Sequence, residues 1–188
     1  YMQYGDYILN VFQGDLGTSL KSQQPVLQGV LARLPITIEL AFYSIMITIV
    51  LGMAAGIISA VRPYSPTDIT VMIVALLGIS LPSFWLGMLL MYVFSVKLHL
   101  LPVAGWDSIL HIILPAFTLG LGGAAIVARM TRSSMLEVVR KDYIRTAQAK
   151  GLKGYVIIYK HALRNALIPV ITVVGLQFGA LLGGTVLI

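Results

Sequence analysis

Side chains that could carry chemistry are few and scattered in this 188-residue chain. The histidines His99, His111 and His161 are far apart, and there is no cysteine to act as a nucleophile or a thiolate ligand. The phosphate-binding pattern G-x-x-x-x-G-K-[ST] is absent. A membrane enzyme would need a nucleophile, a metal cluster or an acid–base pair, and none is visible. The sequence therefore predicts a non-enzymatic chain that binds no metal or cofactor directly.

The composition excludes an ordinary soluble domain. Hydrophobic residues make up 58% of the chain and charged residues 11%, whereas soluble domains carry about 25% charged residues. Four stretches have no charge at all: residues 40–61, 69–96, 108–128 and 165–188. Each has the roughly 20 apolar residues that a helix needs to cross a bilayer. Since barrel strands would alternate in polarity and these stretches do not, we expect an all-α polytopic membrane helix bundle.

Basic residues indicate how the bundle is oriented. Nine of the thirteen lysines and arginines lie between Arg129 and Arg164, against two acids. The positive-inside rule places this loop in the cytoplasm and residues 1–35 and 97–107 outside. A nucleic-acid partner is not expected, because no stacking aromatics or base-reading module accompanies the basic residues.

Proline and amphipathic patterns suggest the divisions of the chain. Residues 1–35 are expected to be an extracytoplasmic segment with a short interfacial helix after Pro25. Spans are predicted at about 36–61, 69–96, 108–130 and 166–188, with a cytoplasmic loop at 131–165. Pro82 predicts a kink in the second span. The two ends of the chain suggest a fragment that lacks a first and a last span.

The basic loop has the pattern of a short, sharply ended helix. Asp142 is predicted to cap its start, Lys150 suits its last turn, and Gly151 can adopt the left-handed conformation that ends a helix. A second helix is expected from about residue 153 into the last span. The small residues Ala147, Ala149 and Gly151 are expected to be exposed and to let a partner approach closely.

This loop resembles the EAA loop of binding-protein-dependent ABC importer permeases. Ala147 and Gly151 match the second alanine and the glycine of EAA-x3-G, while Arg145 and Thr146 replace the glutamate and the first alanine. The stretch from Asp142 to Leu152 and the later H-A-L-R-N-A are similar to the dipeptide/oligopeptide/nickel branch. Three other segments agree with that branch: Gly14-Asp15-Leu16-Gly17-Thr18-Ser19, Arg33-Leu34-Pro35 and Pro82-Ser83-Phe84-Trp85.

The resemblance implies a type I ABC importer permease fold in the prokaryotic inner membrane. It also implies a homologous second permease subunit, two cytoplasmic ATPases that hydrolyse ATP, and an extracytoplasmic solute-binding protein. The loop would be the coupling element, and its contact residues would be Asp142, Tyr143, Arg145, Thr146, Ala147, Ala149, Lys150, Gly151 and Leu152. The loss of the usual glutamate at Arg145 removes any salt bridge made there in other branches.

The solute and its route are less constrained by the residues. Peptides are favoured, with nickel or glutathione as alternatives, and polarity alone suggests Ser83, Thr118 and Gln177 along the path. His111 is interpreted as a residue at a helix start, or as part of a metal path if the solute is nickel. A channel or a secondary transporter is the alternative class, but the predicted spans lack the interior charges expected of one.

Overall fold

The computed structural model describes residues 2–19 and 23–184, and every regular element among them is a helix. The chain divides into two structural units, and the boundary between them in the sequence lies between Glu39 and Leu40. In the first unit, helix α1 (Met2–Phe12) is followed by a turn in which Asp15 Oδ1 accepts a hydrogen bond of 2.8 Å from the Gly17 amide. Helix α1 was not predicted, because its residues show a mixed polar composition.

Helix α2 (Val26–Val61) replaces the predicted interfacial helix and first span with one continuous element. The helix continues through Pro35, so residues 26–35 and the predicted first span lie on one helix. Proline removes one amide donor, but membrane helices tolerate it because neighbouring groups satisfy the freed carbonyl. The apolar residues after Pro25 are therefore the first turns of a longer helix.

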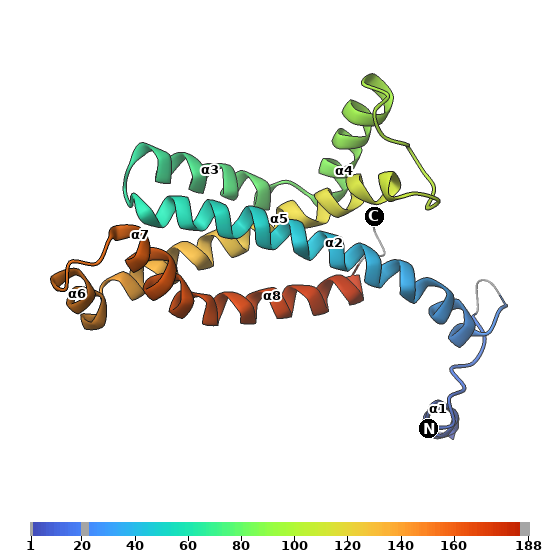
Figure 1. Cartoon of the computed structure of the whole chain (residues 1–188). Coiled ribbons are helices and arrows are strands. Elements are labelled where there is room, and N and C mark those ends of the chain that lie inside the picture. The colour runs from blue at the N-terminus through green and yellow to red at the C-terminus, as the bar shows by residue number, and fades with distance from the viewer. Residues whose placement is uncertain (1, 20–22, 185–188) are drawn as a thin grey trace. The chain divides into compact units, whose positions relative to one another are not determined.

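The second predicted span is a sharply bent pair of helices. Helix α3 (Pro66–Ser80) starts at the N-cap Ser65, whose hydroxyl accepts from the Asp68 amide, and it ends at Leu81. Helix α4 (Ser83–Met91) begins after Pro82 and continues into the π-helical turn η1 (Tyr92–Lys97). The two arms meet at 99°, so the predicted kink is a complete break, as Figure 1 shows.

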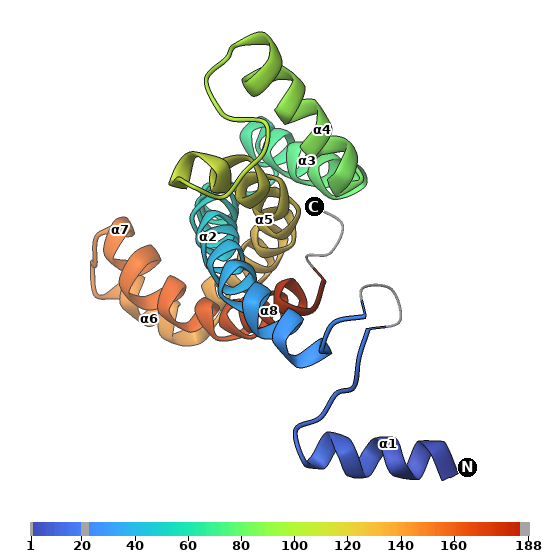
Figure 2. The ribbon, with the colours of Figure 1, turned by 90° about the vertical axis from the view of Figure 1, so that its right-hand side faces the viewer.

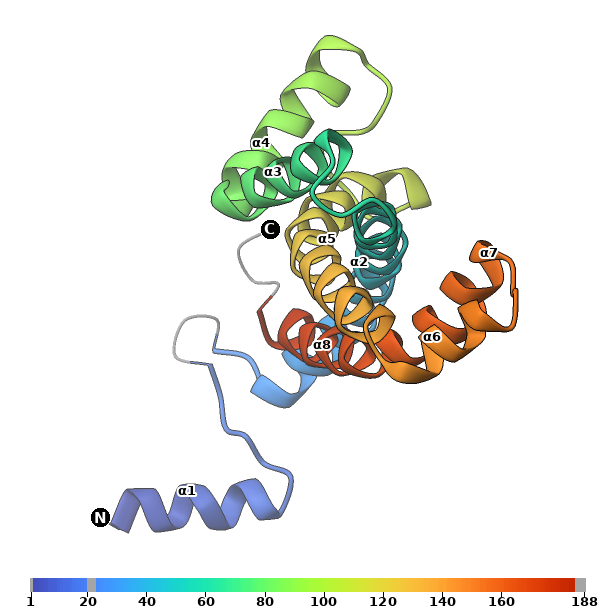
Figure 3. The same cartoon turned by 90° about the vertical axis from the view of Figure 1, so that its left-hand side faces the viewer.

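Helix α5 (Ile109–Val139) is the central helix of the second unit. Figures 2 and 3 show α3 and α8 (Arg164–Gly184) on opposite sides of it. The contact between α2 and α5 depends on glycine: a Cβ on Gly52 would lie 2.7 Å from the Ala124 carbonyl oxygen. One on Gly56 would lie 2.5 Å from Thr131 Cβ. Small residues of this kind let helix backbones approach closely in membranes.

Helix lengths and hydropathy fit the predicted membrane bundle. Val26–Val61, Ile109–Val139 and Gly154–Gly183 are each long and apolar enough to span a bilayer, and the bent pair makes a fourth crossing if its two arms form one span. Large apolar side chains such as Val74, Ile168 and Leu176 are more than half exposed, which is the arrangement expected beside lipid. The prediction of an all-α membrane bundle is confirmed.

Candidate functional site

The basic loop folds into a short helix, α6 (Asp142–Ala149), between α5 and the C-terminal helices. Its N-cap is Lys141, so the prediction that Asp142 caps the helix is wrong by one residue. Asp142 occupies the first helical position, where its carboxylate still faces the positive end of the helix dipole. Arg145 Nη1 lies 3.6 Å from Asp142 Oδ1 in an exposed pair.

The end of α6 is a sharp stop at Gly151, as predicted. Gly151 has φ +73°, and its amide donates to the Gln148 carbonyl at 2.9 Å. The Leu152 amide donates to the Ala147 carbonyl at 3.3 Å. These two bonds make a Schellman motif, in which a left-handed residue closes the last turn of a helix. The chain direction after α6 is therefore fixed by backbone hydrogen bonds.

One face of α6 is anchored in the bundle. Ile144 is fully buried and Ala147 is 7% exposed. They belong to a hydrophobic cluster with the ends of α2, α5 and the C-terminal helices, formed by Ala60, Met135, Ile144, Ala147, Ile157, Ala162 and Ala166. The expectation that Ala147 is exposed is thus wrong, because the three-residue spacing from Ile144 turns both side chains inward.

A further contact ties α6 to the start of α8. The Asn165 amide Nδ2 donates to the Tyr143 hydroxyl at 3.0 Å and to the His161 carbonyl at 2.9 Å. Between α6 and α8 the chain forms α7 (Gly154–Val156) and a π-helical segment, η2 (Ile157–Leu163). The predicted second helix from about residue 153 into the last span is confirmed, with a π-helical turn that was not predicted.

The other face of α6 is open. The exposed residues among those predicted to contact a partner are Asp142, Tyr143, Arg145, Thr146, Ala149, Lys150, Gly151 and Leu152. Polar, basic and small side chains thus cover a helix whose opposite face packs in a cluster with residues of α2, α5, η2 and α8. Such an element can bind a protein and pass on a displacement as a rigid body.

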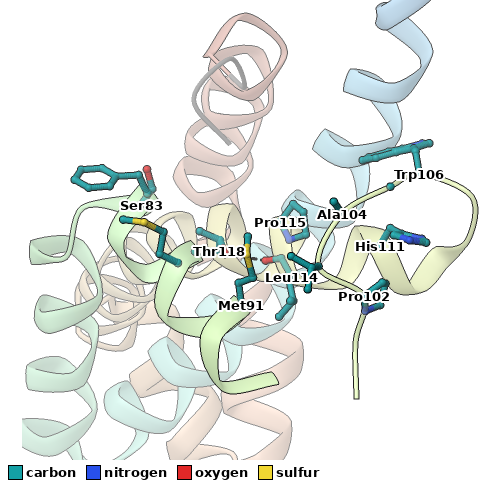
Figure 4. A pocket seen from close by; sticks show the side chains of 14 residues that line it. Ser83, Met91, Pro102, Ala104, Trp106, His111, Leu114, Pro115 and Thr118 are labelled. Carbon is teal, nitrogen blue, oxygen red and sulfur yellow. Dashed lines mark hydrogen bonds between the residues drawn. The ribbon is translucent and has the colours of Figure 1, made fainter. Parts of the chain in front are cut away.

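At the far end of α5 lies a cavity of about 530 Å³. Figure 4 shows its walls, which come from α4, the loop before α5 and the first turns of α5. Ser83 and Thr118 both line it, so two of the three residues suggested for a solute path share one cavity. Gln177 is not among its lining residues; its Nε2 donates to the Gly123 carbonyl at 3.3 Å.

Several residues of this cavity were not predicted. They are aromatic or sulfur-containing side chains, namely Phe84, Trp106, Met88 and Met91, and His111, which was considered as a path residue only for nickel, lines the cavity with them. His111 Nδ1 lies 3.1 Å from the hydroxyl of Ser108, the N-cap of α5, which agrees with its interpretation as a helix-start residue. Polarity alone could not find this set, since most of the lining is apolar.

One known protein family and several known proteins are similar to this chain. Residues 52–188 match the family described as binding-protein-dependent transport system inner membrane component. The chain belongs to this family. It is 45% identical to the dipeptide transport system permease protein DppB of Alkalihalophilus pseudofirmus, over 100% of the chain and 65% of that relative. It is 48% identical to the glutathione transport system permease protein GsiC of Pectobacterium atrosepticum, over 99% of the chain and 61% of that relative.

Membership in the transport system family confirms the resemblance found in the sequence, including its dipeptide/oligopeptide/nickel branch. The chain spans less than two thirds of the length of these curated relatives. The matched region contains α6, the cavity and the helices between them. Both candidate sites thus lie in the part that defines the family.

Proposed function

We propose that this chain is part of the permease subunit of an ATP-driven ABC importer, and that α6 is its coupling helix. The observation that carries the proposal is the two-sided character of α6: Ile144 and Ala147 fix it to the bundle, while Arg145, Ala149 and Lys150 are exposed. ATP-driven approach of two cytoplasmic ATPases would carry the coupling helix with them. The bundle would then move by rigid-body rocking between two access states.

The proposed partners follow from what the chain lacks and what its relatives are named for. It contains no phosphate-binding G-x-x-x-x-G-K-[ST] pattern, so ATP hydrolysis is assigned to separate subunits. A homologous second permease subunit would complete the solute path, and an extracytoplasmic binding protein would deliver the solute. The family description itself names a binding-protein-dependent transport system.

The proposed solute is a small peptide. The two relatives compared are named for dipeptide and for glutathione transport, and glutathione is itself a short peptide. The cavity lined by Ser83 and Thr118 is our candidate for part of the route. Its aromatic and methionine side chains offer apolar contacts for peptide side chains, and the two hydroxyls offer polar ones. Glutathione remains the alternative solute, and the names of these relatives do not favour nickel.

The proposed location is the inner membrane, with α6 on the cytoplasmic side. Exposed basic residues gather at this end of the bundle, where Arg140, Lys141, Lys150, Lys153 and Lys160 all lie on the surface. This agrees with the positive-inside rule. Because the chain has no cysteine, Ala149→Cys and Leu100→Cys provide single reporters at the two ends. In intact cells a membrane-impermeant maleimide should label only Leu100→Cys, and the reverse pattern would refute this orientation.

The function itself is tested by uptake. The complete importer is reconstituted in liposomes with ATP inside and the binding protein outside, and a labelled dipeptide and glutathione are compared. The proposal predicts peptide accumulation that needs both ATP and the binding protein. Uptake that persists without ATP would assign the chain to the channel or secondary-transporter class instead.

A further inference from the structure

An ion pair between a buried carboxylate and a partly exposed guanidinium lies close to the coupling helix, and the proposed function does not use it; the Arg132 side chain is 23% exposed. Asp68, in the first turn of α3, has a side chain that is 3% exposed, and Arg132 of α5 pairs with it. Arg132 Nε lies 2.7 Å from Asp68 Oδ1, and Arg132 Nη2 lies 2.6 Å from Asp68 Oδ2. Two parallel bonds of this kind fix both the distance and the relative orientation of the two groups.

Two further donors saturate the same carboxylate. The Ser59 hydroxyl, from the last turns of α2, donates to Oδ1, and the Tyr64 amide donates to Oδ2 at 2.8 Å. Tyr64 holds a positive φ of 62°, and the Arg132 guanidinium lies 5.9 Å from the centre of its ring. One carboxylate therefore joins the end of α2, the α2–α3 turn, the start of α3 and the last third of α5.

The residues that bind the Asp68 carboxylate are close in sequence to residues that pack against α6. Ser59 precedes Ala60, and Arg132 lies one helical turn before Met135. Ala60 and Met135 both belong to the hydrophobic cluster that holds Ile144 and Ala147 of α6. Figure 1 shows the α2–α3 turn at the same end of the bundle as α6 and α7. Ala60 and Met135, which pack in the cluster with the coupling helix, are thus neighbours of Ser59 and Arg132, which bind the Asp68 carboxylate.

Helix α3 connects this carboxylate to the cavity. It runs for 15 residues, about 22 Å, from Pro66, two residues before Asp68, to Ser80 at the break. Along that length it packs on α5: a Cβ on Gly78 would lie 3.9 Å from Ala125 Cβ. Beyond the break, α4 supplies Ser83 and Gly87 to the cavity wall.

We propose that the Asp68–Arg132 pair is a positioning link that passes displacement of the coupling helix to α3 and so to the cavity wall. The proposal rests on the proposed function. A buried ion pair is weak evidence for stability alone, because desolvation offsets most of the attraction between the charges. Its two parallel hydrogen bonds, however, fix the distance and orientation of α3 relative to α5, so the two helices move together. A single-point contact would let the two helices rotate about it.

The test compares solute transported per ATP hydrolysed in the complete, reconstituted importer. Arg132→Lys keeps both charges but replaces the guanidinium fork with one ammonium group. Asp68→Asn combined with Arg132→Gln removes both charges together, so no unpaired charge stays buried. Glu137→Gln is the matched control, because it removes an exposed carboxylate from the same helix, which pairs with Lys141.

If the ion pair acts as this positioning link, both test variants should copurify with the ATPases at the wild-type yield. They should transport at least threefold less solute per ATP than the wild type. Glu137→Gln should keep the wild-type ratio. Wild-type ratios in both test variants would overturn the inference, and so would failure of both to assemble, since the pair would then serve folding alone. A wild-type complex that hydrolyses ATP without moving solute would refute the proposed function as well.

Discussion

Gly151 decides where α6, the proposed coupling helix, ends, because its φ of +73° lies in the left-handed region. A Cβ there would meet nothing within 4 Å, so the difficulty for another residue is the backbone conformation itself. The left-handed region costs an L-residue about 1–2 kcal/mol, and a β-branched side chain is a particularly poor fit there.

Gly151→Val should therefore loosen the end of α6 and lower ATP-driven uptake, with normal membrane insertion. Gly151→Asn should keep most of the activity, since asparagine tolerates this conformation. Gly154→Ala is the control, because Gly154 has no positive φ and open space around it. Uptake by Gly151→Val at the wild-type rate would show that the cap does not matter.

Two buried threonines in the α2–α5 contact give a paired test of hydrogen bonding. Thr48 Oγ1 donates to the Gly120 carbonyl at 3.0 Å, whereas Thr131 Oγ1 has no partner within the described residues. Thr48→Val should lower the free energy of unfolding by about 1 kcal/mol, and Thr131→Val should leave it unchanged or raise it. Thermal unfolding of the purified protein in detergent measures both, and equal losses in the two variants would contradict the assignment.

At the scale of elements, the close approach of α2 to α5 depends on the missing side chain of Gly56. A Cβ there would lie 2.6 Å from the Ala128 carbonyl oxygen and 2.5 Å from Thr131 Cβ, so the helices would have to separate. Gly56→Ala should destabilise the protein by about 1–3 kcal/mol, as overpacking does.

Gly122→Ala provides the comparison for that substitution. Gly122 lies on α5, and a Cβ at this position would meet nothing within 4 Å, so alanine should be neutral or stabilise the helix by up to about 1 kcal/mol. Melting temperatures of the two variants in the same detergent decide the matter. A Gly56→Ala protein as stable as Gly122→Ala would mean that the contact is looser than described.

Structural elements that local interactions form could be predicted from the sequence, whereas features that packing between helices sets could not. The charge-free stretches predict the membrane helices because each helix satisfies its own backbone within the segment. The stop at Gly151 was also predictable, since the left-handed cap is a local property. The 99° break after Ser80 was predicted only as a kink, because Pro82 marks the place while packing against other helices sets the angle.

The interactions that the sequence did not reveal are those between distant segments. Asp68 and Arg132 are 64 residues apart and appear in the sequence as ordinary charges of two loops. Ala147 was expected at the surface because small residues suit a docking face, yet the cluster around Met135 buries it. Similarly, the sequence suggested Gln177 as a path residue by its polarity and did not reveal that its side chain donates to a carbonyl of α5.

At the scale of the whole molecule, the cavity and the coupling helix should be separable by mutation. Ser83→Trp would place a large ring in the cavity, more than 50 residues from α6 in sequence. Peptide uptake should fall at least tenfold, and the ATPase subunits should still copurify. Ser80→Trp is the control, since Ser80 is exposed and absent from the cavity lining. Normal uptake by Ser83→Trp would exclude this cavity from the route.

The central claim is that a cytoplasmic ATPase subunit binds the exposed face of α6. Its most direct test attaches a photoreactive maleimide to the cysteine introduced by Ala149→Cys, in a complete importer from which any other cysteines have been removed, and asks which subunit is cross-linked. The account predicts a product with an ATPase subunit, with a yield that changes when ATP is added, and none from Leu100→Cys at the opposite end. An ATPase product from Leu100→Cys, or its absence from Ala149→Cys in a transport-competent complex, would contradict the account.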